Sequence, residues 1–260
     1  MLGEARLIDI GDRSLYARVS GAGPVVVLNS GAGREGVGTW STVETRSSEF
    51  ATVVAYDRAG LGRSPPTAAP PTALDMVADL ELLLHALELS RPLFLVGTSL
   101  SGLLVQLYAC EHPQDIGGLL LLDPTPDEFL ASFPNLPSAI QDSMRTAALE
   151  NSRKLGVSEA AVWETQKIFE SGEQVRQAVV EEMRMPNVEF VVITACKPME
   201  ASGKPMGGAA PGSTLADAHR RMAERVPQGR HLLAERSSHN TIISNDSDLI
   251  VETIRSIVSL

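Results

Sequence analysis

Ser99 is the residue whose surroundings in the sequence point to covalent chemistry. It lies in the stretch Gly-Thr-Ser-Leu-Ser-Gly, residues 97–102, directly after an apolar run over 92–96 and before a helical pattern. In a parallel sheet, the carboxyl end of a strand faces the crevice where ligands bind. A tight turn there strains the backbone and requires small neighbours, such as Gly97 and Gly102. The stretch therefore predicts a nucleophilic serine, and the alternative is a glycine-softened turn without chemistry.

His239 is the histidine that the sequence places at the same edge of the sheet. A serine hydroxyl becomes an effective nucleophile when a base takes its proton, and histidine suits this role because its pKa lies near neutrality. His239 lies in a polar loop just past the last predicted strand, and its alternative role is that of an exposed loop histidine. The other histidines are expected to have structural roles: His85 in a helix, His112 at a helix end, His219 on a solvated helix face and His231 in a strand.

Strands and helices alternate along most of the chain, and this alternation would position both residues. Apolar runs and period-two patterns predict strands over 5–10, 14–19, 24–29, 51–56, 92–96, 118–122, 188–194 and 230–234. Helical spacing of apolar residues predicts helices over 40–48, 73–89, 100–111, 138–155, 158–170, 172–185, 214–226 and 246–258. The pattern indicates an α/β fold, with a mostly parallel central sheet flanked by helices on both faces. The simplest division is a core of residues 1–123 and 188–260 with a helical cap inserted at 124–187.

Four stretches of the chain resemble the α/β-hydrolase fold family, in its serine hydrolase type. They are Ser-Gly-Ala-Gly at 30–33, Tyr-Asp-Arg-Ala-Gly-Leu-Gly-Arg-Ser at 56–64, the turn around Ser99, and Ser-His at 238–239. The turn matches the family's G-x-S-x-G pattern except that Ser101 takes the place of the last glycine. The order serine, acid, histidine along the chain also agrees with the family. The resemblance implies an α/β-hydrolase core and a serine nucleophile.

The acid that would orient His239 has two candidates. In the family the acid usually follows the strand after the insertion, but the stretch 191–200 has no aspartate. Asp123 ends the strand after the serine helix. It resembles the acid of those family members that carry it at this position, and it is the favoured candidate. Glu200 lies farther along a flexible loop and is the alternative, because its longer side chain could reach. Without a catalytic role, Asp123 would open a turn with Pro124, and Glu200 would be solvated.

The backbone N–H groups of Ala32 and Leu100 are expected to form an oxyanion hole. Leu100 directly follows the nucleophile, and Ala32 matches the family's donor in the loop after the third strand. Family members often have a histidine where this chain has Ser30, which affects the support of the loop rather than the donor itself. Asp57 and Arg58 have side chains suited to catalysis, but the resemblance implies a structural role for them beside that loop.

The expected activity is hydrolysis of an ester or lactone of a small, fairly apolar acyl compound, through Ser99, His239, Asp123 and an acyl-enzyme. Few charged residues lie near the serine motif in the sequence, which favours a neutral substrate. Apolar residues of the cap are candidates for the pocket, and no more than two of them are expected to touch substrate: Phe129, Leu130, Phe133, Trp163 and Phe169.

Other functions stay open on the same residues. The triad could instead cleave a carbon–carbon bond or an amide, or support perhydrolysis. An epoxide hydrolase or a dehalogenase is disfavoured, because those relatives carry aspartate at the nucleophile position. From another class, the chain could be a non-catalytic ligand-binding protein that has kept the hydrolase fold.

Composition limits the partners and the compartment. The net charge of -10 and the pI near 5.0 argue against nucleic acid, because phosphate binding needs clustered Lys and Arg. The two cysteines, Cys110 and Cys196, form no zinc-like spacing with histidine, so no metal or organic cofactor is expected. No apolar run is long enough to cross a bilayer, and the first residues lack a signal-peptide pattern. We expect a cytoplasmic enzyme acting on a small molecule, and the sequence does not indicate its oligomeric state.

Overall fold

A computed structural model gives the structure of the chain. It describes residues 2–126, 137–140, 142–143, 146, 150, 159–171, 177, 179, 185–197 and 214–259. The predicted helices over 138–155 and 172–185, and most of the predicted cap, lie outside these residues or are described only at isolated positions.

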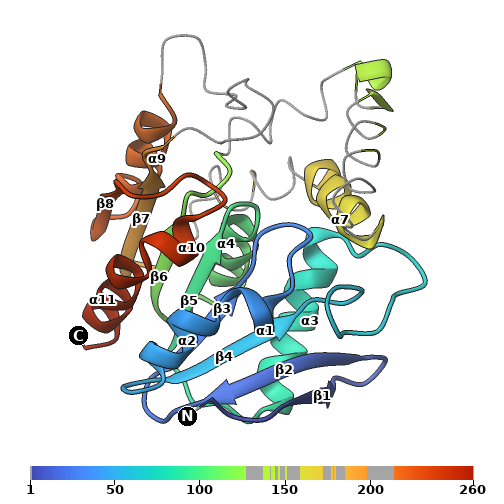
Figure 1. Cartoon of the computed structure of the whole chain (residues 1–260), viewed down its shortest axis with the longest axis horizontal. Coiled ribbons are helices and arrows are strands. Elements are labelled where there is room, and N and C mark those ends of the chain that lie inside the picture. The colour runs from blue at the N-terminus through green and yellow to red at the C-terminus, as the bar shows by residue number, and fades with distance from the viewer. Residues whose placement is uncertain are drawn as a thin grey trace.

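The described strands form one eight-stranded sheet (Figure 1). Its order is β1-β2-β4-β3-β5-β6-β7-β8, with β1 and β2 antiparallel to their neighbours and the pairs from β4 to β8 parallel. The strands are β1 (Ala5–Asp9), β2 (Ser14–Ser20), β3 (Val25–Asn29), β4 (Thr52–Asp57), β5 (Leu93–Thr98), β6 (Ile116–Leu122), β7 (Glu189–Ala195) and β8 (Gly229–Ala234). All eight predicted strands are confirmed within one or two residues at their ends.

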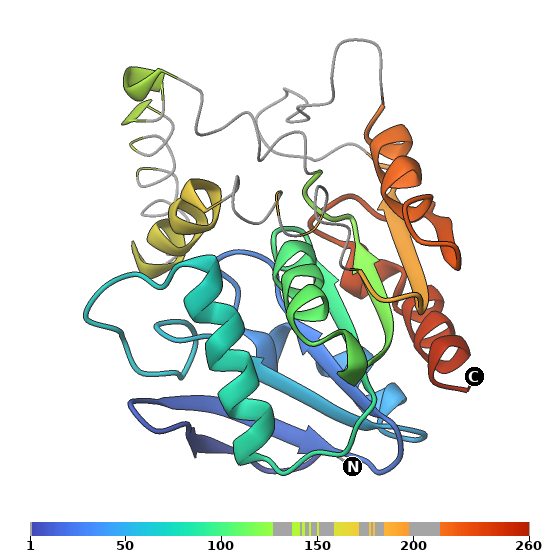
Figure 2. The ribbon, with the colours of Figure 1, turned by 180° about the vertical axis from the view of Figure 1, so that it is seen from behind.

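Helices cover both faces of this sheet (Figures 1 and 2). One face carries α3 (Ala73–Ala86), α4 (Ser101–Glu111) and α9 (Leu215–Ala223). The other face carries α1 (Gly36–Thr39), α2 (Ser41–Ser47), α10 (Ile242–Asn245) and α11 (Ser247–Val258). A short 3-10 turn, η1 (Pro113–Asp115), leads into β6, and α7 (Glu159–Glu170) lies beyond the carboxyl edge of the sheet.

The two apolar cores explain why the central strands are apolar throughout. In β5, Leu93 and Leu95 pack in the core under α3 and α4, whereas Phe94 and Val96 pack in the core under α2 and α11. Successive residues of a strand point to opposite faces, so a strand buried on both faces needs apolar residues at every position. The predicted α/β class, with a mostly parallel sheet, is confirmed.

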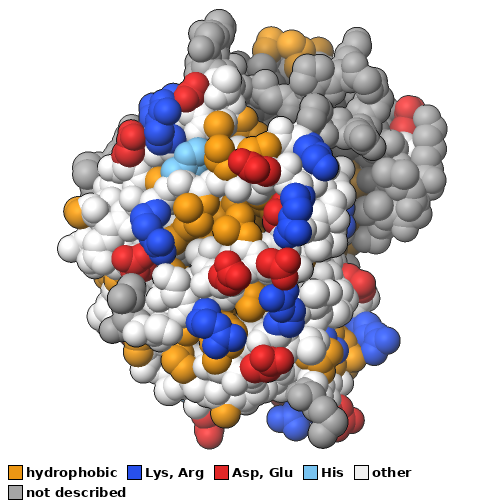
Figure 3. Space-filling model, turned by 60° about the vertical axis from the view of Figure 1, so that its left-hand side comes forward, with side chains coloured by type: hydrophobic (Ala, Val, Ile, Leu, Met, Phe, Trp, Pro, Cys, Tyr) orange, Lys and Arg blue, Asp and Glu red, His pale blue; other side chains and the backbone are white. Residues whose placement is uncertain are grey.

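The surface is charged but mixed. On the face shown in Figure 3, the acidic and basic side chains are interspersed, and a hydrophobic patch lies between them. No helix among the described residues is both long and apolar enough to cross a membrane.

Candidate active site

Ser99 lies in a tight turn between β5 and α4. Its φ of 55° is in the left-handed region, which a residue with a side chain rarely adopts. A Cβ at Gly97 would come within 2.7 Å of the Ser101 carbonyl oxygen, and a Cβ at Gly102 within 2.9 Å of the Pro124 side chain. The small neighbours expected from the sequence are therefore required by close packing.

Ser101, the departure from the glycine pattern, contributes hydrogen bonds to this turn. Its buried hydroxyl accepts from the Thr98 N–H at 2.9 Å and lies 2.7 Å from the Asn29 carbonyl oxygen, to which it can donate. The serine thereby links the ends of β3 and β5, which flank the loop that approaches Ser99.

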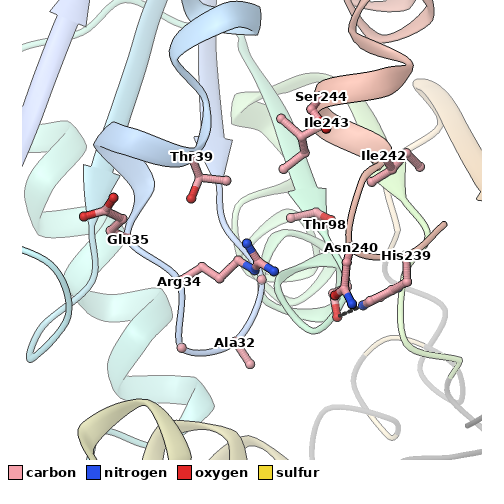
Figure 4. A pocket seen from close by; sticks show the side chains of 13 residues that line it. Ala32, Arg34, Glu35, Thr39, Thr98, His239, Asn240, Ile242, Ile243 and Ser244 are labelled. Atoms are coloured by element: carbon pink, nitrogen blue, oxygen red, sulfur yellow. Dashed lines mark hydrogen bonds between the residues drawn. The ribbon is translucent and has the colours of Figure 1, made fainter. Parts of the chain in front are cut away.

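His239 reaches Ser99 from the loop after β8. Its Nε2 lies 3.0 Å from the Ser99 Oγ, a hydrogen bond drawn as a dashed line in Figure 4. The loop is held by its own polar groups, because the Ser238 N–H donates to the Thr241 hydroxyl at 3.0 Å and the Ser237 hydroxyl bonds the Asp246 carboxylate. The two residues are 140 positions apart in the chain and meet at one edge of the sheet.

Asp123 completes the row on the far side of the imidazole. One carboxylate oxygen, Oδ2, lies 2.6 Å from His239 Nδ1, and the other, Oδ1, accepts from the Ala195 N–H at 2.9 Å. The carboxyl group is buried, with 2% of the side chain exposed. Asp123 also has a left-handed backbone, with φ of 45°, and its N–H donates to the Ile193 carbonyl at 2.7 Å. The alternative acid, Glu200, lies outside the described residues.

A buried histidine lies behind Asp123, and here the sequence prediction is wrong. His219 was expected on a solvated helix face, but its side chain is fully buried. Its Nε2 lies 2.7 Å from the Pro124 carbonyl oxygen, which can only accept, so Nε2 carries the proton. Nδ1 then accepts from the Thr194 hydroxyl at 2.8 Å, and that hydroxyl lies 2.7 Å from His231 Nε2.

Burial and the nearby negative charge shift the pKa of His219 in opposite directions. Burial lowers the pKa of His219, and Asp123, whose Oδ1 lies 3.9 Å from His219 Nδ1, opposes that shift. His219 is therefore a neutral ring that supports the segment carrying Asp123. Helical spacing could have indicated this burial, because His219 lies on the same face of α9 as the apolar residues Ala218 and Met222.

The loop that carries Ala32 passes directly over Ser99. A Cβ on Gly31 would lie 3.2 Å from the Ser99 Cβ, so glycine permits this approach. Arg58 holds the loop in place, donating to the Ser30 carbonyl and, at 2.9 Å, to the Gly31 carbonyl. Within the described residues, no hydrogen bond uses the N–H of Ala32 or of Leu100. Both N–H groups are free to donate to a bound oxygen.

Asp57 has the structural role expected for it. Its carboxylate accepts from the N–H groups of Gly36 at 2.6 Å and Val37 at 2.9 Å, at the start of α1, and from the Arg63 N–H at 3.0 Å. It therefore ties the loop after β4 to the start of α1.

Glu164 is a functional candidate that sequence analysis missed. It lies on α7, only 2% of its side chain is exposed, and both its oxygens bond Arg58, at 2.5 and 2.9 Å. The Gly33 N–H also donates to it at 2.8 Å. No local pattern could have revealed this contact, because the partners lie 106 and 131 residues apart in the sequence.

A pocket of about 700 Å³ opens at Ser99 and His239. Its described lining also includes Ala32, Arg34, Glu35, Thr39, Asn240, Ile242 and Ile243 (Figure 4). Few charged groups were expected near the serine, and the described lining holds two, Arg34 and Glu35, both from the loop after β3.

Of the five apolar residues expected in this pocket, Trp163 alone has a side chain that the structure describes. Trp163 lines a separate groove of about 400 Å³ between α7 and the loop after β4, together with Pro70 and Pro71. Phe129, Leu130 and Phe133 lie outside the described residues, as does the side chain of Phe169. Among the described residues, no group of three or more His, Cys, Asp or Glu side chains is arranged to hold a metal ion.

Comparison with known proteins identifies the family. Residues 23–171 match the model of the alpha/beta hydrolase fold, which is more than half of the 260-residue chain. The chain belongs to the α/β-hydrolase fold family. The matched region contains the turn around Ser99, whereas His239 lies beyond it.

Curated relatives match over parts of their length. The chain is 34% identical over 140 residues to the probable transporter efuK of Hormonema carpetanum, covering 50% of this chain and 20% of that protein. It is 32% identical over 126 residues to the uncharacterized protein YqjL of Bacillus subtilis, covering 48% and 49%. It is 34% identical over 113 residues to the pimeloyl-[acyl-carrier protein] methyl ester esterase of Chromobacterium violaceum, covering 44% and 42%. The match thus spans half or less of the length of each of these relatives.

Solved structures share the fold along the whole chain. The alpha/beta hydrolase domain-containing protein 10 from mouse superposes with a TM-score of 0.71 at 17% identity, covering 99% of each chain. The enol-lactonase from Burkholderia xenovorans superposes with a TM-score of 0.69 at 15% identity, covering 98% of this chain and 100% of that one. At such identities the likeness concerns the fold.

Proposed function

We propose that this α/β-hydrolase family member cleaves an ester or lactone bond of a small acyl substrate by way of an acyl-enzyme. The observation that carries the proposal is the row Ser99 Oγ, His239 Nε2, His239 Nδ1 and Asp123 Oδ2, joined at 3.0 and 2.6 Å. A relative that is an esterase by name, the pimeloyl ester enzyme, supports the same reaction class.

The proposed reaction begins with attack of the Ser99 hydroxyl oxygen on the substrate carbonyl carbon. His239 Nε2 accepts the hydroxyl proton, and Asp123 keeps Nδ1 protonated and stabilises the imidazolium. The proton then passes to the leaving oxygen, the carbon–oxygen bond breaks, and an acyl group remains on Ser99. Water attacks this acyl group in the same way, with His239 again as the base, and releases the acid and the free serine.

The N–H groups of Ala32 and Leu100 are the proposed donors to the oxygen that becomes negative. Removal of one such donor typically lowers the rate by about 10²- to 10³-fold, because a preorganised donor needs no reorientation as charge develops. Arg58 would support this hole indirectly, since it bonds the carbonyls of Ser30 and Gly31, the two residues before Ala32.

The segment between β6 and β7 is proposed to be a cap. We assign residues 1–123 and 188–260 to the hydrolase core and residues 124–187 to this cap. The described helix α7 supports the assignment. It lies beyond the carboxyl edge of the sheet and contacts Gly33 and Arg58 through Glu164 (Figure 1).

Substitution of Ser99 tests the function. Ser99→Ala should lower p-nitrophenyl acetate turnover by about 10³-fold or more, since no other group can carry the acyl intermediate. A fluorophosphonate probe should label the wild-type chain and fail to label this variant. Ser90→Ala, an exposed serine between α3 and β5, is the control and should still be labelled. Turnover retained by Ser99→Ala would refute the proposal, and a wild-type chain with neither turnover nor labelling would favour a ligand-binding protein.

A further inference from the structure

Arg34 stands out in the pocket as a cation without a partner. It follows Gly33 in the loop after β3 and lines the same cavity as Ser99 and His239. Figure 4 shows its side chain extending from that loop into the pocket, toward the side where Asn240 and His239 lie. Within the described residues, no hydrogen bond or ion pair uses its guanidinium, although 32 acidic residues give the chain an excess of negative charge.

Two neutral polar side chains also line the pocket, Thr39 on the side of Arg34 and Asn240 on the side of His239 (Figure 4). No hydrogen bond within the described part of the chain uses either side chain. The apolar residues Ile242 and Ile243 lie on the same side as Asn240, across the pocket from the loop that carries Arg34 (Figure 4). The pocket thus offers one positive charge from the loop after β3, and across from it a side that combines polar and apolar groups.

The nearby acid does not neutralise Arg34. Glu35 is the next residue, but its carboxylate lies against Gly38 of α1, where a Cβ would clash with it. In Figure 4 its carboxylate points away from Arg34. The other acid of the site, Asp123, is engaged by His239 and by the Ala195 N–H.

We propose that Arg34 binds a free carboxylate of the substrate, so that the preferred substrate is an ester or lactone carrying a second, ionised carboxyl group. A guanidinium binds a carboxylate through two parallel hydrogen bonds, which orients the ligand as well as attracting it. One cation matches a single negative charge, and among the described residues that line the pocket Arg34 is the one Lys or Arg side chain. This inference rests on the proposed function, and it replaces the neutral substrate expected from the sequence.

Methyl esters of straight-chain diacids provide the test. Monomethyl adipate and dimethyl adipate share one chain and one scissile ester type, and differ in the free carboxylate. For the wild-type chain we expect kcat/KM per ester group to be about tenfold higher for the monomethyl ester, because an unpaired arginine gains a charge-assisted partner. That preference should decrease between about 0.05 M and about 0.5 M NaCl, because salt screens the attraction.

Substitutions then assign the preference to Arg34. Arg34→Gln should lower the ratio of the two kcat/KM values by about tenfold, and Arg34→Lys should keep part of it, because lysine retains the charge but not the paired geometry. Use of the ratio cancels any general disturbance of the neighbouring oxyanion loop. Arg6→Gln makes the same change of charge at an exposed position of β1, an outer strand three strands away from β3, and should leave the ratio as in the wild type.

The outcomes separate the two proposals. If the wild-type chain hydrolyses the dimethyl ester but shows no preference for the monomethyl ester, or if Arg34→Gln retains the full preference, the role of Arg34 is wrong and the esterase proposal stands. If the wild-type chain hydrolyses neither adipate ester nor p-nitrophenyl acetate, the proposed function itself fails, and the inference fails with it.

Discussion

Ser99 and Asp123 both have a backbone in the left-handed region, with φ of 55° and 45°. Such a conformation costs about 1–3 kcal/mol at a residue with a side chain and persists only when its surroundings enforce it. Around Ser99 the enforcing contacts are the Leu122 carbonyl, which accepts from the Ser99 N–H at 3.0 Å, and the Thr125 N–H, which donates to the Ser99 carbonyl at 3.2 Å. The segment that carries Asp123 therefore also holds the serine turn.

Substitution of the acid tests this residue-scale arrangement. Asp123→Asn should lower kcat for ester hydrolysis by about 10³- to 10⁴-fold, because an amide cannot hold His239 in the correct tautomer and charge state. Glu200→Gln should change kcat by less than about threefold, since Asp123 already occupies the Nδ1 side of His239. Steady-state kinetics on p-nitrophenyl acetate measures both. Full activity of Asp123→Asn together with inactivity of Glu200→Gln would assign the acid to Glu200.

At the scale of elements, a buried ion pair joins α7 to Arg58, which in turn bonds the loop after β3. Glu164 and Arg58 are 2% and 5% exposed, and Arg58 continues to the Ser30 and Gly31 carbonyls. Glu164 adds a bond to the Gly33 N–H. A displacement of α7 would therefore change the support of the loop that carries Ala32.

Loss of Glu164 should be costly for that reason. Glu164→Ala should lower the free energy of unfolding by about 3–5 kcal/mol, because it leaves the Arg58 charge buried without its partner. Urea denaturation, followed by circular dichroism, measures the change. The matched control is Glu170→Ala on the same helix, whose ion pair with Lys167 is more than one-third exposed on each side and typically contributes about 1 kcal/mol or less. An equal effect of the two substitutions would show that the buried pair does not anchor α7.

At the scale of the whole molecule, buried titratable groups make stability depend on pH. Burial lowers the pKa of His219 and of His231. At a pH below about 6.5, the unfolded chain binds protons that the folded chain does not, so these histidines decrease stability as the pH falls. Asp79 acts in the opposite direction, because burial raises its pKa to about 6 and the folded chain takes up its proton first.

The contribution of His219 can be isolated from the others. His219→Gln can still donate to the Pro124 carbonyl but does not titrate, so the loss of stability between about pH 7 and about pH 5.5 should be smaller than in the wild type, by up to about 1.4 kcal/mol per pH unit. Urea denaturation at both pH values measures this difference, and the contribution of Asp79 cancels in the comparison. His85→Gln, at an exposed position of α3, is the control. An unchanged pH dependence in His219→Gln would contradict a neutral buried imidazole.

Much of this protein follows from local patterns in its sequence. Apolar strands alternating with helices determine a parallel sheet, and the order of glycines around Ser99 determines a tight turn at its carboxyl edge. Because the carboxyl ends of parallel strands share one edge, Ser99, Asp123 and His239 could be placed together before any distance was known. Each of these inferences depends on residues that are neighbours in the chain or on a rule of sheet topology.

The tertiary structure decided what depends on side chains that meet from distant elements. The burial of His219 depends on which face of α9 packs on β7, and neighbouring arginines gave the wrong indication. The pairing of Glu164 with Arg58 joins α7 to the loop after β4, and no sequence period indicates such a contact. The direction of Arg34 depends on the bend of the loop after β3, which Arg58 and Asp57 fix from another strand. Local sequence determines which groups reach the edge of the sheet, whereas long-range packing determines how each of them is held and what it faces.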